Sequence, residues 1–185
     1  PESCGPATPA YEVKIVDPSS TETLPKGATG ELWVRGGHVI KGYLNRPEAT
    51  EETIVDGWLR TGDMAKMDED DFIYIVDRIK DMVLRGGENI YCAEVESAIF
   101  DHPAVSECTV FGVPDDRLGE EVGAAVFVGN SKLDATELRE HCRNLIASFK
   151  VPKYVWFMDG PLPRNASGKF LKRELREKLS INDSV

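Results

Sequence analysis

The chain has 185 residues, of which 32 are acidic and 22 basic, so its formal net charge is −10 at pH 7. This charge repels phosphate groups over most of the surface, which argues against nucleic acid and anionic membranes as partners. No apolar run approaches the roughly 20 residues that a membrane-spanning helix needs, and no signal segment opens the chain. We therefore expect a globular cytoplasmic protein without a transmembrane segment.

The cysteines and histidines do not indicate a metal or redox site. The four cysteines lie far apart with no C-x-x-C pair, and the three histidines are isolated from one another, whereas zinc and redox sites need clustered ligands. We expect no metal ligand on this chain. The cysteines expected to be reduced and mostly structural are Cys4, Cys92, Cys108 and Cys142.

The first part of the chain is predicted to be mostly β. Residues 11–17 and 30–36 alternate apolar and polar side chains, which is typical of half-buried strands. Pro47 can begin a short helix whose first turn is acidic. Residues 58–76 contain two strand-like runs around the acidic turn 68–71, which predicts a hairpin. These patterns predict that residues 1 to about 77 are all-β apart from one helix. Because the chain starts at Pro1 and a strand-like pattern begins within about ten residues, we expect it to be a piece of a larger protein.

From residue 80 onward the pattern indicates mixed helices and strands. The apolar stripe of one predicted helix is expected to lie in the core, and Asp134 is its predicted N-cap. The stripe consists of Leu138, Cys142, Leu145, Ile146 and Phe149. The expected helices cover 93–100, 134–149 and 171–179, and the expected strands cover 105–113, 122–128 and 154–158. This order predicts an α+β domain over residues 80–185, with helices on a small sheet.

Two polar clusters interrupt the core pattern. Asp63 ends the run "RTGD", where a carboxylate can accept two hydroxyl hydrogen bonds, as from a ribose; a turn-forming Asp after Gly62 is the alternative. Gly86 and Gly87 lie in "DRIKDMVLRGGENI", where a backbone without side chains can approach a ligand closely. A tight hairpin turn explains the glycine pair equally well.

A third cluster is "PLPRNASGKFLKREL", residues 161–175, in which Lys169 follows the Ser167-Gly168 pair. It is not a P-loop, because the glycine spacing is wrong and Phe170 follows the lysine. Composition and spacing leave two interpretations of Lys169, a solvated surface lysine or a contact to a substrate anion.

Five segments in the same order resemble the carboxyl-terminal part of the adenylate-forming enzymes, which include acyl-CoA synthetases, luciferases and the adenylation domains of peptide synthetases. They read "GELWVRGGHVIKGYLNRPEATEETI", "GWLRTGD", "VDRIKDMVLRGGENIYCAEVESAI", "HPAVSECTVFGVPDDRLGEEVGAAVFV" and "FKVPKYVWFMDGPLPRNASGKFLKREL". The run "KDMVLRGGENIYCAEVE" is most similar to the acyl-CoA synthetases. The resemblance implies that residues 1–79 end the large domain and that residues 80–185 form the small mobile domain.

The resemblance also implies the chemistry. A carboxylic acid, expected to be a fatty or similar acid, attacks the α-phosphate of Mg²⁺-bound ATP, and coenzyme A then displaces AMP. Asp63 is expected to bind the ribose hydroxyls, with Arg78 nearby on ribose or phosphate. Lys80 is expected to be the hinge about which the small domain rotates between the two steps.

The remaining expected roles lie in the second half of the chain. Gly86, Gly87 and Glu88 are expected beside the pantetheine arm of coenzyme A. Lys169 is expected to bring the carboxylate and the α-phosphate together, on a loop made flexible by Ser167 and Gly168.

Two departures from the family pattern stand out. Cys92 replaces a common proline, and the Gly/Ser/Thr-rich phosphate loop and the Thr-Glu motif are not among these residues. We therefore expect the chain to be inactive alone. A peptide-synthetase adenylation domain, which uses a carrier-protein thiol, and a non-catalytic interaction module remain alternatives, and the acid and any homo-oligomer remain open.

Overall fold

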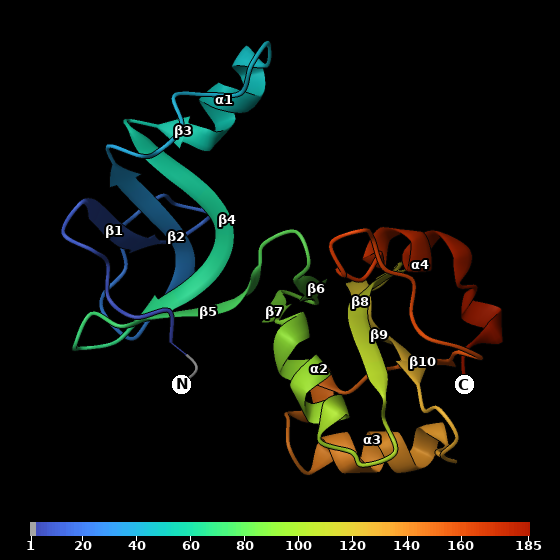
Figure 1. The fold of residues 1–185 in the computed structure, drawn as a ribbon. Helices are drawn as coiled ribbons and strands as arrows, with labels where there is room; N and C mark the ends of the chain where they lie inside the picture. The colour runs from blue at the N-terminus through green and yellow to red at the C-terminus, as the bar shows by residue number, and fades with distance from the viewer. Residues whose placement is uncertain (1–2) are drawn as a thin grey trace. The chain divides into compact units, whose positions relative to one another are not determined.

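The computed structural model describes residues 3–185, which form two compact units that meet in sequence at Lys80 and Asp81 (Figure 1). Unit 1 ends at Lys80 and unit 2 begins at Asp81. The sequence predicts the domain boundary between residues 79 and 80; that the units are the large-domain end and the mobile domain stays a prediction. Among the described residues, no helix combines the length and the apolar character needed to cross a bilayer.

Unit 1 is an antiparallel sheet with one short helix. Strand β2 lies between β1 and β4, while β3 and β5 both pair with β4. The helix begins at Pro47, whose fixed φ suits a first helical position. The elements are β1 (Tyr11–Val16), β2 (Thr29–Gly36), α1 (Pro47–Thr53), β3 (Ile54–Val55), β4 (Trp58–Met67) and β5 (Ile73–Arg78).

The core of unit 1 is small and lies on one face of this sheet. Ile15, Leu32, Ala65 and Ile73 are buried there, one from each of β1, β2, β4 and β5. Alternation along the strands places these side chains on the same face. The acidic turn between β4 and β5 is closed by Asp68, whose Oδ1 accepts the N–H groups of the residues at 70 and 72. The predicted strands, helix and hairpin of this region are therefore confirmed.

Unit 2 is a five-stranded sheet covered by helices on both faces. Its central strand β9 pairs with β8 along one edge and with β10 and β6 along the other, and β7 pairs with β6. The β9–β10 pair is parallel. The strands are β6 (Val83–Arg85), β7 (Glu88–Ile90), β8 (Glu107–Asp115), β9 (Gly119–Phe127) and β10 (Tyr154–Phe157). The helices are α2 (Cys92–Phe100), α3 (Ala135–Arg143) and α4 (Lys172–Lys178), with short 3-10 turns at Ser148–Lys150 and Ile181–Asp183.

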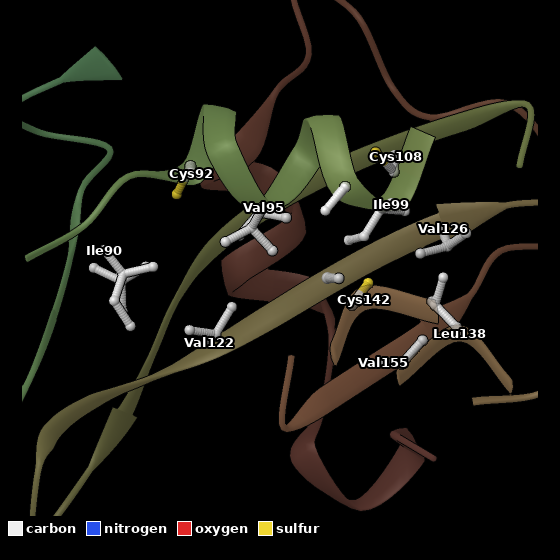
Figure 2. Packing of buried hydrophobic residues seen from close by; sticks show 14 of the residues in the cluster. Ile90, Cys92, Val95, Ile99, Cys108, Val122, Val126, Leu138, Cys142 and Val155 are labelled. Atoms are coloured by element: carbon white, nitrogen blue, oxygen red, sulfur yellow. The ribbon is translucent and has the colours of Figure 1, made fainter. Parts of the chain in front are cut away.

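The two faces of this sheet carry separate cores. On one face, α2 and α3 pack on the sheet through buried side chains that include Val95, Ile99 and Leu138 (Figure 2). On the other face, Leu175 of α4 packs with Trp156 of β10 in a second cluster. The α+β class and the helix-covered sheet predicted from the sequence are confirmed.

One local prediction in unit 2 is confirmed, and two others differ from the structure. Asp134 is the N-cap of α3, since its Oδ1 accepts the N–H groups of Thr136 and Glu137. However, α3 ends at Arg143, so Leu145 leaves the predicted stripe and is 51% exposed. The short strands β6 and β7 are not among the strands expected from the apolar pattern, although they flank the glycine pair that a hairpin turn would explain.

The cysteines are free, as expected. Cys92, Cys108 and Cys142 are buried in the core between the helices and the sheet (Figure 2). Cys4 is exposed. Burial raises the pKa of Cys142 to about 11, and it also raises the pKa of Cys108. These buried thiols are part of the hydrophobic core of unit 2.

Candidate functional site

Asp63 and Arg78 form an ion pair in unit 1. They are opposite one another on β4 and β5, and Arg78 Nε donates to Asp63 Oδ1 at 2.8 Å. The Asp63 side chain is 29% exposed and that of Arg78 is 62% exposed. The pair therefore presents a carboxylate and a guanidinium side by side at the surface, where both can meet a polyhydroxyl or anionic ligand.

Asp63 lies in a bulge of β4. Trp33 pairs with Arg60 and Glu31 with Met64, so the β4 residues between these two pairs face only Leu32 of β2. Such a bulge redirects side chains out of the regular alternation. The bulge contains Gly62 at φ +72°, in the region that favours glycine.

Lys80 is the last residue of unit 1, two residues beyond Arg78. It lies in the turn that follows β5, and it is exposed. A position between two compact units is where a hinge needs to be. The hinge role itself stays a prediction.

Gly86 and Gly87 form the turn of the β6–β7 hairpin. Their φ values are +59° and +91°, and Arg85 pairs with Glu88 across the two-residue loop. Two successive positive φ values are typical of a type I′ turn, which strongly favours glycine. The hairpin-turn interpretation of this glycine pair is therefore confirmed. Because Gly86, Gly87 and Glu88 are also exposed, the turn leaves bare backbone available to a ligand.

A partly buried ion pair fixes this hairpin to the sheet. Arg85 donates to Glu121 on β9 through Nε at 2.6 Å and NH2 at 3.2 Å, and Lys153 Nζ lies 3.3 Å from the same carboxylate. Although burial alone would raise the pKa of Glu121, the bonds from Arg85 and Lys153 lower it below the usual range. The ion pair with Glu121 therefore holds the residue before the glycine turn against β9.

Lys169 lies on a short hairpin-like loop in unit 2. Arg164 and Phe170 form an isolated antiparallel bridge, and the Asn165 side chain closes the loop by accepting the N–H groups of Ser167 and Lys169, each at 2.9 Å. The glycine between them occupies the turn at φ +80°. Ser167 and Gly168 therefore form a hydrogen-bonded turn, and the expected flexibility of this loop stays a prediction.

The base of this loop is tied to β8 by Glu107. Its carboxylate accepts the Leu162 N–H at 2.7 Å and Arg164 NH2 at 3.0 Å, and the Arg164 guanidinium also lies 4.0 Å from the Phe170 ring centroid. Lys169 itself is exposed, and its ammonium makes no hydrogen bond or ion pair within residues 3–185. The loop thus presents a solvated cation on an ordered support.

The predicted site residues fall into two groups. The structure brings Asp63 and Arg78 together in unit 1, followed closely by Lys80, while the residues 86–88 and Lys169 lie on two separate turns of unit 2. Over the described part of the chain, no group of three or more His, Cys, Asp or Glu side chains could hold a metal ion.

Sequence reasoning missed the carboxylates that support these groups. Glu31 accepts the Gly62 N–H beside Asp63, and Glu107 supports the Lys169 loop. Both lie on strands whose apolar alternation dominates the pattern. One signal was available for Glu31: Trp33, two positions away, lies on the same face of the strand and indicates that this face is covered as well.

Comparisons with known proteins match both units. Residues 1–44 match the AMP-binding enzyme family, and residues 94–169 match the family of AMP-binding enzyme C-terminal domains. The chain is 48% identical to the feruloyl-CoA synthase of Amycolatopsis sp, over 91% of this chain and 34% of that protein. It is 45% identical to the long-chain-fatty-acid–CoA ligase of Yersinia pestis, over 95% of this chain and 31% of that protein.

A solved structure agrees with these matches. The crystal structure of ATP-bound MatB from Rhodopseudomonas palustris is similar with a TM-score of 0.89 and 40% identity, over 96% of this chain and 35% of that one. The chain thus spans about a third of the length of the proteins that it matches. Since both family matches and these similarities agree, the chain belongs to the AMP-binding, adenylate-forming enzymes.

Proposed function

We propose that these residues are part of an ATP-dependent, AMP-forming acid–thiol ligase. The enzyme activates a carboxylic acid as an acyl-adenylate and transfers the acyl group to coenzyme A. The observation that carries the proposal is the Asp63–Arg78 pair, 2.8 Å apart, in a chain of the adenylate-forming family. A carboxylate paired with a guanidinium at the surface suits a ligand that has both hydroxyl groups and a phosphate.

In this proposal Asp63 accepts hydrogen bonds from the ribose hydroxyls. Arg78 occupies Oδ1, so Oδ2 and the second lone pair of Oδ1 are the acceptors offered to the ligand. Arg78 keeps the carboxylate in place and places positive charge near the ribose or the phosphate.

Lys169 supplies charge for the adenylation step. As the carboxylate approaches the α-phosphate, two anions come together, and a placed ammonium lowers the energy of that arrangement. The hydrogen-bonded turn supports this role, because it holds the backbone from which the Lys169 side chain extends.

The glycine turn serves the thioester step. Gly86 and Gly87 expose backbone, which allows the pantetheine arm of coenzyme A to pass closely, with Glu88 beside it. Lys80 is the hinge that exchanges the two conformations. In this proposal the Lys169 loop serves adenylation and the Gly86-Gly87 turn serves thioester formation.

The acid is proposed to be a fatty acid or a similar carboxylic acid. The relatives named above include both a feruloyl-CoA synthase and a long-chain-fatty-acid–CoA ligase, so an aromatic acid is the competing substrate. Mg²⁺ is expected to enter with ATP, and we assign none of its ligands to residues 3–185. We also propose that the 185 residues alone do not catalyse the reaction, because the phosphate loop and the Thr-Glu motif are not among them.

The test uses the full-length enzyme that contains this chain. It is incubated with ATP, Mg²⁺ and coenzyme A together with palmitate, octanoate or ferulate, and nucleotide and thioester products are measured by chromatography. We expect AMP and acyl-CoA in equal amounts with at least one acid. Formation of ADP, or no acid-dependent AMP with any of the three, would refute the proposal.

A further inference from the structure

Glu31 is a buried carboxylate at the back of the bulge that carries Asp63. The residue is 2% exposed, and it is the only acid of unit 1 among the buried residues of the described chain. Burying an ionised carboxylate is costly unless its oxygens find donors. The donors to Glu31 therefore show what it stabilises.

Three groups donate to this carboxylate. The indole Nε1 of Trp33 and the guanidinium Nε of Arg60 lie 2.9 and 3.1 Å from Oε2, and the Gly62 N–H lies 3.2 Å from Oε1. Arg60 also supplies the opposite charge. Trp33 and Arg60 hold one oxygen, which leaves the other directed at the backbone immediately before Asp63.

The Gly62 N–H is one of several backbone groups that the bulge removes from the β2–β4 ladder. The Asp63 N–H of the bulge donates to Thr61 Oγ1 at 3.1 Å, and on the β5 side the Gly62 carbonyl accepts the Ile79 N–H at 2.9 Å. Glu31 reaches the same turn from β2 and accepts directly from its backbone. The path of the chain into Asp63 therefore depends on this carboxylate.

We propose that Glu31 is a positioning residue for Asp63, and that it acts through Gly62 to set the direction in which the Asp63 carboxylate faces the ribose. The inference rests on the proposed function. Arg78 fixes the Asp63 side chain from β5, and Glu31 fixes the adjoining backbone from β2. The Asp63 carboxylate is thereby constrained from β2 and from β5, the two strands that neighbour β4.

A carboxylate is required at this position rather than an amide. A glutamine side chain would have a single acceptor oxygen and an NH₂ group that only donates. Whichever way the amide turned, its NH₂ would face either the Gly62 N–H or the Trp33 and Arg60 donors. Glu31→Gln therefore loses part of the bulge support while the volume of the side chain is conserved.

The experiment compares ATP with 2′-deoxy-ATP as substrates of the full-length enzyme. The readout is the kcat/KM for ATP divided by the kcat/KM for 2′-deoxy-ATP. The deoxynucleotide lacks the 2′-hydroxyl donor, so a correctly placed ribose acceptor is left unpaired and discriminates against it. We expect Asp63→Ala to bring the ratio close to one and Glu31→Gln to lower it at least about fivefold. A merely structural role would lower both kcat/KM values together and leave the ratio unchanged.

Two further variants make the outcome specific. Glu12→Gln removes an exposed carboxylate of the same sheet, which pairs with Arg35, and it should retain the wild-type ratio. If Glu31→Gln does not fold, Gly62→Ala replaces it, because a side chain at φ +72° strains the same bulge. An unchanged ratio in the folded bulge variant overturns the inference.

Failure of the proposed function and failure of the Glu31 role give different results. If Asp63→Ala does not change the ratio, Asp63 is not the ribose acceptor and the proposed function loses its carrying observation. If Asp63→Ala abolishes discrimination while Glu31→Gln preserves it, the proposed function stands and only the role of Glu31 is wrong.

Discussion

Lys172 Nζ lies 2.9 Å from Glu96 Oε1, and this ion pair joins the first turn of α4 to α2. Glu96 also accepts the Val110 N–H at 2.8 Å and the Thr109 hydroxyl at 3.2 Å. The pair is largely buried, with side chains 22% and 25% exposed. Because α4 follows the Lys169 loop directly, the pair fixes the chain at the end of that loop.

Lys172→Met is expected to destabilise unit 2 by about 1.5–3 kcal/mol, the range for a hydrogen bond to a charged group. Burial disfavours the Lys172 ammonium, but the attraction to Glu96, Cys92 and Asp81 together outweighs it and the pKa of Lys172 is raised. The stabilisation is thus complete below the unfolded pKa of about 10.4 and is lost as the pH rises through the folded value. Urea unfolding of the variant and the wild type, monitored by hydrogen exchange in residues 81–185, measures the difference in stability at each pH.

The control for that prediction is Lys178→Met, which removes an exposed pair with Glu174 on the same helix. It should leave the unfolding midpoint unchanged, because exposed pairs contribute little. Equal destabilisation by both variants, or a difference that persists unchanged to the most alkaline pH, would show that the Lys172 pair is not the source.

Lys169→Ala is expected to slow acyl-adenylate formation in the full-length enzyme by roughly 10² or more, the scale for one preorganised electrostatic group. Thioester formation from supplied acyl-adenylate should change much less. Acid-dependent exchange of pyrophosphate into ATP measures the first step, and acyl-CoA formation measures the second. Lys132→Ala, at another exposed lysine of unit 2, should affect neither step. Equal losses in both steps contradict the assignment.

Local signals explain why much of the fold can be predicted from the sequence. Asp134 is recognisable as an N-cap because its side chain bonds to Thr136 and Glu137, two and three residues away. The three-residue strands β6 and β7 are too short to show any periodicity, so only their glycine turn is visible. The end of α3 at Arg143 is only weakly signalled by Asn144, because no glycine or proline follows to interrupt the apolar pattern at Leu145.

The site is predictable only in part for a related reason. Asp63 and Lys169 stand out through family motifs, which report residue types at short spacing. Their supports come from far along the chain: Glu31 bonds to a residue 31 positions away and Glu107 bonds to Arg164 at 57 positions. Contacts of this kind depend on strand register, which residue pattern alone does not determine.

Gly87→Ala is expected to raise the KM for coenzyme A several-fold without changing adenylation. No atom lies within 4 Å of an added Cβ, so the methyl group would face solvent or ligand, while a positive φ adds strain of about 1–2 kcal/mol. Gly129→Ala is the control for backbone strain, because Gly129 also has a positive φ in unit 2 but lies outside the hairpin; its added Cβ would lie 3.1 Å from Ser106 Oγ. Similar effects of both variants on the KM would remove Gly87 from the coenzyme A site.

Thiol labelling of the native chain is expected to modify one of the four cysteines rapidly at a pH of about 7.5. Cys4 is exposed, whereas the other three are buried. Burial also raises the pKa of Cys142 to about 11, so little of it is the reactive thiolate. Mass spectrometry should find one label in the native chain and four in urea. Rapid labelling that persists in Cys4→Ser would contradict the burial of the core thiols.

Lys80→Pro tests the hinge in the full-length enzyme. Proline restricts φ to about −65°, so the residue cannot make a backbone change that requires a different φ. If Lys80 is the hinge between the units that meet at Lys80 and Asp81, one conformation is lost. We expect adenylation to continue and thioester formation to fall by at least about 10², with both steps measured separately. Lys80→Ala keeps backbone freedom and should retain both steps, whereas normal turnover in Lys80→Pro would place the hinge elsewhere.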